Sequence, residues 1–398
     1  MSPRPRTTLI IAVIAQAAVS VVQFGLPAIG VDIQNKFGLG PAGFGAVFAA
    51  VGLGSAVALI PAGMLVDRLG ARPVLLAGAT INFCAYLAAS VAPNAALFAA
   101  AIFLAGIGSS AVPVAGMSSL LREFPPERRG IALGWRQLAV PMGGTIGAVA
   151  LPLLAHLGGV RLALIVTAFA TASTAGVFAW LSAAGGGTAR RMRLDGALTA
   201  RGMRPLLVVG LLYVYALGAS LTYIVAAARD DGLGKAEAGA LFVVLNLSAA
   251  ASRLVWGRMA DRGRGTRRVR TLVECGMLAA IAGMAMGPVL HVGVVLAVPV
   301  TVALGFGCFG WNGVLYVTAG ELVGPDRAAR AVGVASTMVF GAGSLAAPIS
   351  GLVAEHAGYD VMWLTAAASS AAGAVFAWRA LAWMRRPRTG AAVGATAR

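Results

Sequence analysis

The chain has 398 residues, of which 59% are hydrophobic and only 11% are charged, and its formal net charge is +17. Its mean hydropathy is +0.85. So few charged side chains cannot cover the surface of a water-soluble domain, and these values therefore exclude a soluble globular protein. Lipid must be the solvent for most of the side chains.

Apolar runs that are long enough to cross a membrane recur along the whole chain. An α-helix crosses the hydrocarbon core of a bilayer, which is about 30 Å thick, with roughly 20 apolar residues. The runs are 9–31, 44–65, 73–92, 95–121, 131–155, 161–184, 205–228, 236–257, 271–290, 293–320, 331–354 and 361–383. The first run lacks a small-residue cleavage site and is too long for a signal peptide, so we predict a retained helix. We therefore expect an all-α polytopic membrane protein with twelve transmembrane helices.

The arginines lie mainly in loops on one side of the predicted membrane. Counted from the N-terminus, the basic loops "DRLGARP", "REFPPERRG", "GRMADRGRGTRRVR" and "PDRAARA" all fall on the side of the N-terminus. The opposite side receives only Lys36, Arg161, Arg229 and Lys235. Basic loops stay in the cytoplasm during insertion, so we expect a multi-pass protein of the cell membrane with both termini cytoplasmic. A basic face toward anionic lipid headgroups explains the net charge without a role for nucleic acid.

The sequence shows no pattern of cysteines or catalytic residues that predicts a disulfide framework, a metal site or an enzyme. Cys84, Cys275 and Cys308 fall within apolar runs, which predicts neither a disulfide framework nor a metal site. The sequence contains no HExxH motif, no Walker-type loop and no Ser/His/Asp spacing. We therefore expect neither an enzyme nor a bound cofactor or metal.

The sequence contains an internal duplication. The charged segment "GMLVDRLGAR" begins at Gly63, and "GRMADRGRGTRR" begins 194 residues later (257 − 63) at Gly257. A second pair, "REFPPERRG" and "GELVGPDRAARA", follows the predicted fourth and tenth helices. We therefore predict two six-helix domains, 1–189 and 205–398, joined by a cytoplasmic linker at 190–204. Matching hairpins on one side of both domains are typical of a two-fold axis along the membrane normal.

With these motifs the chain resembles the major facilitator superfamily over nearly its whole length. The family's loop between helices 2 and 3 reads roughly GxxxDRxGxR, and a degenerate second copy lies between helices 8 and 9. The residues that fill the two loops are Gly63, Asp67, Arg68, Gly70, Arg72, Gly257, Asp261 and Arg262. The matching residues after helices 4 and 10 are Glu123, Arg128, Glu321 and Arg327.

The resemblance implies a secondary transporter of a small molecule, in which two six-helix bundles rock around a central site. No ATP-binding motif is found, so the energy should come from ion or solute gradients, with protons as the simplest coupling ion. We expect no cofactor, and we expect a monomer. The alternative outside transport is a sensor that has lost transport activity, but the sequence shows no appended signalling domain.

Each residue of the first loop has a physical role to fill. Gly63 removes a side chain where another helix must approach closely, and Asp67 is placed to accept backbone N–H groups at a helix start. Arg68 and Arg72 can pair with Glu123 or Asp67 and hold the two halves shut on the cytoplasmic side. The alternative is that the hairpins only fix loop geometry and membrane topology.

The predicted fifth helix contains a small-residue face. Gly143 and Gly147 are four residues apart, a spacing that allows another helix to pack closely. Antiporters of the superfamily often show a longer Gly/Pro pattern here, but Ala148 stands in place of its proline and Leu151–Pro152 in place of its terminal glycines. The sequence therefore predicts close packing at this helix and leaves symport, antiport and uniport open.

The resemblance implies that helices 1, 4, 7 and 10 line the central cavity. On helix 1, Gln16, Ser20 and Gln23 form one polar stripe, and polar groups in lipid are costly unless they meet protein, water or a ligand. The candidate substrate-binding residues are Gln16, Gln23, Arg136, Tyr213, Tyr223, Asn246, Trp311, Asn312 and Tyr316. For the tyrosines of helix 7 and for Trp311, interhelical packing is the alternative.

The charges inside the predicted helices bear on the class of substrate. No Asp or Glu falls at mid-membrane, and Asp32 is the only acidic candidate for proton coupling on a cavity helix. Arg136 and Arg253 lie inside helices 5 and 8, where an unpaired guanidinium favours an anionic solute. The alternative is that both arginines snorkel to the headgroups. We therefore expect transport of a small organic anion, with proton-coupled efflux of amphipathic drugs or secondary metabolites as the alternative.

Overall fold

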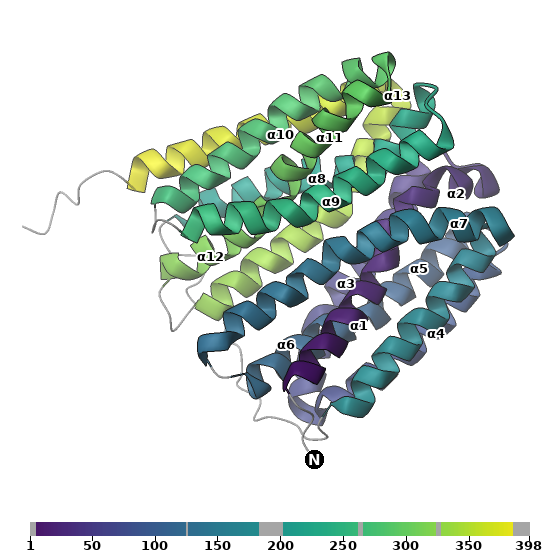
Figure 1. The fold of residues 1–398 in the computed structure, drawn as a ribbon, viewed down its shortest axis with the longest axis vertical. Coiled ribbons are helices and arrows are strands. Elements are labelled where there is room, and N and C mark those ends of the chain that lie inside the picture. The colour runs from purple at the N-terminus through teal and green to yellow at the C-terminus, as the bar shows by residue number, and fades with distance from the viewer. Residues whose placement is uncertain (1–4, 125, 183–201, 262–265, 324–327, 385–398) are drawn as a thin grey trace, which may run out of the picture.

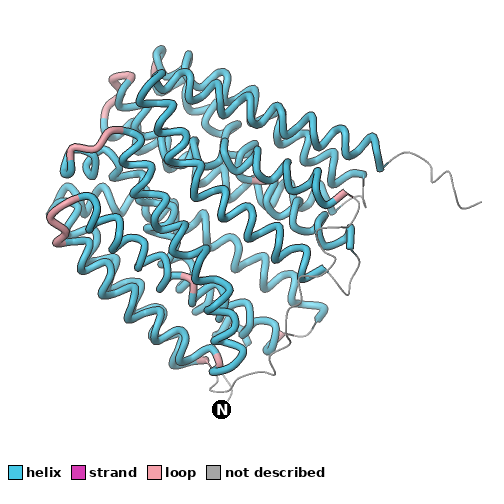
Figure 2. Tube along the Cα trace, turned by 180° about the vertical axis from the view of Figure 1, so that it is seen from behind, coloured by secondary structure: helices cyan, strands magenta, loops and turns pink. Residues whose placement is uncertain are grey.

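The structure, a computed structural model, describes residues 5–124, 126–182, 202–261, 266–323 and 328–384, and every regular element in these ranges is a helix. Figures 1 and 2 show long helices joined by short loops. The elements are α1 (Pro5–Gly25), the 3-10 turn η1 (Leu26–Ile29), α2 (Gly30–Phe37), α3 (Pro41–Leu69), α4 (Ala71–Ser90), α5 (Ala95–Ser109), α6 (Ala111–Glu123), α7 (Pro126–Leu181), α8 (Met203–Asp230), α9 (Lys235–Asp261), α10 (Thr266–Val292), α11 (Val294–Phe309), α12 (Trp311–Val323) and α13 (Ala328–Met384). Most of the predicted linker at 190–204 lies outside the described residues.

Ten helical segments of the described chain are long and apolar enough to cross a membrane. Two of them, Trp135–Leu181 and Val334–Ala380, have 47 residues each. At 1.5 Å per residue that is about 70 Å, more than twice the thickness of the hydrocarbon core. Non-helical backbone dihedrals divide α7 at Gly158 and Gly159 and divide α13 at Gly358. If each of the two 47-residue segments is counted as two crossings, the total reaches the twelve that the sequence predicts.

Several of the predicted helices are broken at positions that the sequence pattern did not show. The first membrane segment passes from α1 through η1 to α2, because Pro27 in the 3-10 turn has no N–H to continue an α-helix. The fourth and tenth predicted helices are each divided by one residue, Ser110 and Gly310, and a 13-residue helix follows each break. The breaks recur at matching places in the two parts of the chain, as expected for a duplicated unit.

Most helix contacts lie within each half of the chain, and fewer lie between the two halves. Within the first half α1 packs extensively on α7, and within the second α8 packs on α13. The halves meet along two helix pairs, α3 with α13 and α7 with α9. Each pair joins the second membrane segment of one half to the fifth of the other, so a two-fold operation relates the pairs. Figure 1 shows the halves side by side, the purple-to-teal half beside the green-to-yellow one.

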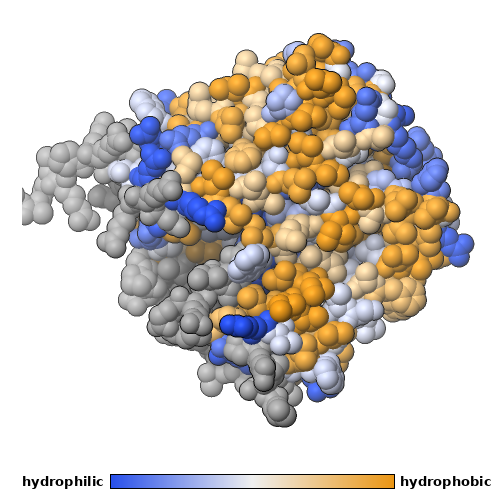
Figure 3. Space-filling view, viewed as in Figure 1, coloured by the Kyte–Doolittle hydropathy of each residue, from blue (hydrophilic) through white to orange (hydrophobic). Residues whose placement is uncertain are grey.

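The two ends of the helical bundle carry different charged residues. Figure 3 shows apolar side chains over much of one face and hydrophilic ones gathered toward its ends. One end, called the arginine-rich end below, carries Arg6, Arg68, Arg72, Arg204, Arg258 and Arg270. The opposite end, called the far end, carries Asp32, Asp231, Lys235, Glu355 and Asp360. The distribution of basic loops predicts that the arginine-rich end faces the cytoplasm.

The close packing predicted for Gly143 and Gly147 is confirmed. A methyl group added to Gly147 would meet the carbonyl oxygen of Val21 and lie 2.8 Å from Cα of Gly25, both on α1. One added to Gly143 would meet the carbonyl oxygen of Ala17. Only glycine allows α1 and α7 to approach this closely, so these positions fix the spacing of the two helices.

We expect Gly147→Ala to lower the thermal stability of the purified protein. The added methyl group forces α7 away from the backbone of α1, and overpacking of this kind costs about 1–3 kcal/mol. Gly176 on the same element is the matched control, because no atom lies within 4 Å of the position of its missing Cβ. Gly176→Ala should leave the melting temperature unchanged or raise it, since Ala favours helix. Equal melting temperatures for the two variants would contradict the packing role of Gly147.

Candidate functional site

The loop that fills the diagnostic motif is a one-residue connection between α3 and α4. Gly70 alone separates the two helices, and its φ of 87° lies in the region that side chains disfavour. Asp67 and Arg68 lie in the last turn of α3, Arg72 lies in the first turn of α4, and all three are exposed. The glycine of the motif thus sets the sharp reversal of the chain at the arginine-rich end.

Three expectations for this loop are wrong in the structure. A Cβ on Gly63 would lie 3.8 Å from Val114, which is ordinary contact, so no other helix approaches closely there. Asp67 does not cap α4, because Gly70 is the N-cap and no side chain caps that helix. No ion pair within the described residues joins Arg68 or Arg72 to Asp67 or Glu123. Asp67 lies near the end of α3 and Glu123 at the end of α6, while the side chains of Arg68 and Arg72 are exposed.

The second copy of the motif pairs its charges inside one half of the protein. Arg268 at the start of α10 forms an ion pair with Glu321 near the end of α12. Sequence reasoning missed Arg268, although its place among the arginines before α10 was the available signal. Because both helices belong to the second half, this pair does not hold the two halves together.

Other residues of the predicted motif set contribute less to the structure. No atom lies within 4 Å of a Cβ built on Gly257. Arg262, Arg327 and the side chains of Arg128 and Asp261 lie outside the described residues. Glu123 ends α6, and its Oε2 is buried without a hydrogen-bond partner. Burial raises the pKa of its carboxyl.

Two of the predicted substrate-binding residues meet inside the first half of the protein. Nη1 of Arg136 on α7 donates a hydrogen bond of 3.1 Å to Oε1 of Gln16 on α1. Nε2 of Gln16 lies 3.4 Å from the Ser20 hydroxyl, which extends the chain along the helix. Arg136 as a whole is only 6% exposed, its Nε has no partner, and no carboxylate pairs with its guanidinium among the described residues. A Cβ on Gly116 would lie 3.5 Å from Cδ of Arg136, so α6 also borders this group.

Arg253 makes a contact between the two halves. Its Nη1 donates a 2.9 Å hydrogen bond to the backbone carbonyl of Gln137 on α7. Nε of Arg253 is buried and has no partner. Gln137 directly follows Arg136, so the charged group in the first half and the cross-half contact lie on the same turn of α7.

The remaining predicted residues do not gather into one site. Tyr213 donates a 2.6 Å hydrogen bond to the carbonyl of Leu272, and its ring contacts Trp311 with centroids 5.6 Å apart. Both residues are buried in the second half, as the packing alternative expects. Asn246 is buried where α9 meets Gly144 of α7. Gln23, Asn312 and Tyr316 are half-buried, and Oδ1 of Asn312 has no partner.

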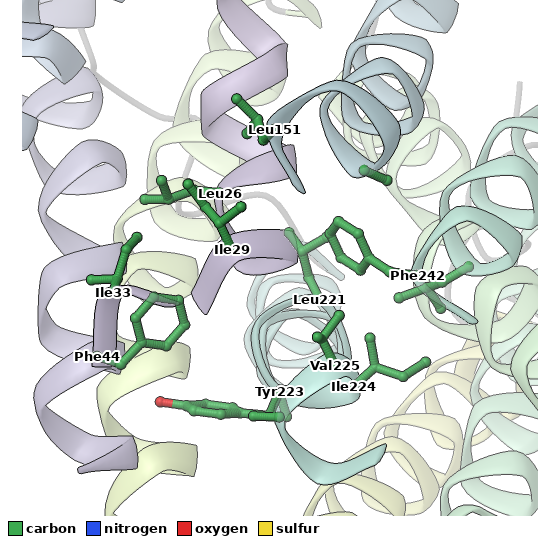
Figure 4. Close-up of a cluster of buried hydrophobic side chains, with 14 of the residues drawn as sticks. Leu26, Ile29, Ile33, Phe44, Leu151, Leu221, Tyr223, Ile224, Val225 and Phe242 are labelled. Carbon is green, nitrogen blue, oxygen red and sulfur yellow. The ribbon is translucent and has the colours of Figure 1, made fainter. Parts of the chain in front are cut away.

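Tyr223 of α8 joins three helices at the far end. Its hydroxyl lies 2.8 Å from the carbonyl oxygen of Pro41 on α3 and 2.8 Å from that of Ala347 on α13. Its ring meets Phe44 edge-on, with centroids 6.4 Å apart. Figure 4 shows the Tyr223 ring beside Phe44, in a buried cluster to which η1, α2 and α8 contribute Leu26, Ile33, Leu221 and Val225. Because α3 and α8 belong to different halves, this cluster closes the interface at the far end.

Two polar contacts continue this closure at the surface. Nζ of Lys235 lies 2.9 Å from Oδ1 of Asp32, across the two halves. Oε2 of Glu355 accepts a 3.0 Å hydrogen bond from the backbone N–H of Ala42, at the first turn of α3. Asp32, the predicted candidate for proton coupling, is therefore paired with a lysine in this structure. These contacts, with Tyr223, form what we call the far-end seal.

We expect the far-end seal to be open in a larger fraction of molecules in the Tyr223→Phe variant. The variant keeps the ring but removes the hydroxyl, whose single hydrogen is shared between the two carbonyl oxygens, and the loss of one such hydrogen bond costs about 1 kcal/mol. Hydrogen exchange of the first turns of α3, followed by mass spectrometry, should become faster by roughly five-fold or more. Tyr359→Phe is the matched control, since its ring centroid lies 6.3 Å from that of Tyr223. Unchanged exchange in Tyr223→Phe, or an equal effect of both variants, contradicts this role.

Comparisons with known proteins place this arrangement among transporters. A family model described as the Major Facilitator Superfamily matches residues 8–348. An uncharacterized MFS-type transporter of Mycobacterium tuberculosis is 25% identical over 332 residues, which cover 78% of this chain and 70% of that protein. Multidrug resistance protein MdtL of Escherichia coli is 32% identical over 142 residues, 35% of this chain and 34% of that protein. A solved bacterial homolog of the human lysosomal transporter Spinster, inward-facing and occupied, gives a TM-score of 0.76 at 16% identity over 96% of each chain.

Proposed function

The chain belongs to the major facilitator superfamily, whose members are membrane transporters, and we propose that this protein carries a small organic anion across the cell membrane by alternating access. The two halves would rock about the α3–α13 and α7–α9 interfaces. The far-end seal would open as the arginine-rich end closes. Ion or solute gradients would supply the energy, with protons as the first coupling ion to test.

The unpaired charge of Arg136 is the observation that carries this proposal. A guanidinium has five N–H donors, and one hydrogen bond to a neutral amide leaves most of its capacity unused. Keeping a cation at 6% exposure costs several kcal/mol unless an opposite charge is near. A carboxylate or phosphate group would supply both the charge and the acceptors, and bidentate pairing with arginine is especially stable.

The position of Arg136 links ligand binding to movement of the halves. An anion bound to Arg136 would act on one turn of α7. The carbonyl of Gln137 in the same turn accepts the hydrogen bond from Arg253. A hydrogen bond to a charged group contributes about 1.5–3 kcal/mol. A ligand that favours one arrangement of this turn by that amount shifts the balance between two conformations by roughly ten-fold or more.

Efflux of amphipathic drugs is the second candidate. The names of relatives such as MdtL support it, but that likeness covers only 35% of this chain. Exporters of cationic drugs need a buried carboxylate to hold the ligand. In the described chain every carboxylate lies within roughly two turns of a helix end, which favours the anion.

We expect organic anions to raise the melting temperature of the purified protein. The panel contains mono- and dicarboxylates, inorganic anions, sugars, amino acids, and cationic and neutral drugs. A ligand at one hundred times its Kd stabilises the folded state by about 2.7 kcal/mol. Arg136→Gln should lose the response to anions only. Gln16→Glu should lose it too, because a carboxylate at the position of Oε1, 3.1 Å from the guanidinium, would compete with the ligand.

Gln34→Glu is the matched control, since it adds the same charge on α2 at the far end, away from Arg136, and should keep the anion response. If neutral or cationic amphiphiles stabilise wild type, the Arg136 variant and the Gln16 variant alike, the anion proposal is wrong and drug efflux takes its place. Counterflow in liposomes with the stabilising ligand then separates a transporter from a sensor, because only a transporter exchanges labelled for unlabelled solute.

A further inference from the structure

A cavity of about 370 Å³ lies inside the second half at the arginine-rich end. It is enclosed by α8, α10, α12 and α13, and side chains such as Leu206, Val209, Leu272 and Leu322 line it. Among the described lining residues only Thr318 carries a hydroxyl, and it donates to the carbonyl of Val314 in its own helix at 2.7 Å. Apart from Arg379, the described lining residues therefore offer apolar surface, which suits a hydrocarbon chain.

The first half shows why this cavity exists. Phe178 follows the helix break at Gly159 by 19 residues (178 − 159), and Ala377 follows the break at Gly358 by the same number (377 − 358). Phe178 is fully buried and packs among α1, α4 and α6. Ala377 lines the cavity at the matching place. The second half thus lacks one aromatic ring that fills the equivalent space in the first.

The mouth of the cavity carries positive charge. Arg379 lines the cavity and is exposed, and the exposed Arg204 precedes the lining residue Pro205. Within the described chain no carboxylate pairs with either guanidinium. Arg268 and Arg270 at the same end do have acidic partners, since Arg268 pairs with Glu321 and Arg270 pairs with Glu274. Two free cations beside an apolar cavity complement an amphiphile with an anionic head.

We propose that this cavity binds an acyl chain of an anionic phospholipid of the bilayer, with its phosphate held by Arg379 and Arg204. The lining helices are membrane-spanning segments, and the arginine-rich end lies where anionic headgroups gather. Phe376, which also lines the cavity, is exposed on the outer surface of the bundle, so the chain enters sideways from the lipid. The site is separate from Arg136, and it stands whether or not the transported solute is an anion.

The test compares lipid binding by the full-length protein and two kinds of variant. Ala377→Phe fills the cavity with the ring that the first half already contains. Arg379→Gln combined with Arg204→Gln removes the charge at the mouth but keeps the cavity. Protein in detergent is titrated with phosphatidylglycerol or phosphatidylcholine of equal chain length, and bound lipid is counted by native mass spectrometry. Arg258→Gln is the control, because it removes an exposed arginine at the same end that is not part of the cavity.

Wild type and Arg258→Gln should each retain a phosphatidylglycerol molecule in preference to phosphatidylcholine. The double arginine variant should lose that preference, by about fivefold for each arginine, and Ala377→Phe should bind neither lipid at this site. Equal retention of the two lipids by wild type overturns the proposal, as does a Phe variant that melts normally and still holds lipid. If the Phe variant does not fold, the double arginine variant decides alone: unchanged preference contradicts the proposal.

Discussion

The bilayer removes water from most of this chain, so every polar group inside must find its partner within the protein. Backbone groups are satisfied by the helices themselves. Many buried hydroxyls use the same local solution and donate to a carbonyl four residues earlier, as Thr167, Ser220 and Thr301 do at 2.7–2.8 Å. The few buried polar atoms that this solution cannot reach are the ones that a ligand or a second conformation can stabilise. The Nε atoms of Arg136 and Arg253 belong to this set.

Small residues allow the two halves to meet without locking together. Along α3, Gly45 and Gly52 face Ala347 and Ser344 of α13, where any added Cβ would collide. The backbones therefore come close through van der Waals contact, with few polar bonds to break when they separate. The described bonds that cross the interface, at Tyr223, Lys235, Arg253 and Glu355, are few and individually modest. An interface of this kind is stable enough to define one conformation and weak enough to leave it.

The two halves repeat each other in backbone more closely than in side chains. The helix breaks at Ser110 and Gly310 match, as do those at Gly159 and Gly358. Their charges do not match, because Arg268 pairs with Glu321 while Arg68 and Arg72 remain exposed. Their cores also differ, since Phe178 fills a space that Ala377 leaves open. A duplicated scaffold can thus place a buried arginine without an acidic partner among the described residues in one half and an apolar cavity in the other.

The sequence by itself determined the membrane location, the helical class, the duplicated motifs and the close-packed face of Gly143 and Gly147. These follow from composition, run length and residue spacing, which act locally along one helix. It also identified Gln16 and Arg136, because polar residues in apolar helices are rare. Only the tertiary structure decided that these two meet, that Arg68 and Arg72 have no acidic partner among the described residues, that Tyr223 belongs to the far-end seal and that Ala377 borders a cavity. Each of those outcomes depends on which faces of distant helices come together, and no spacing within a single helix specifies that.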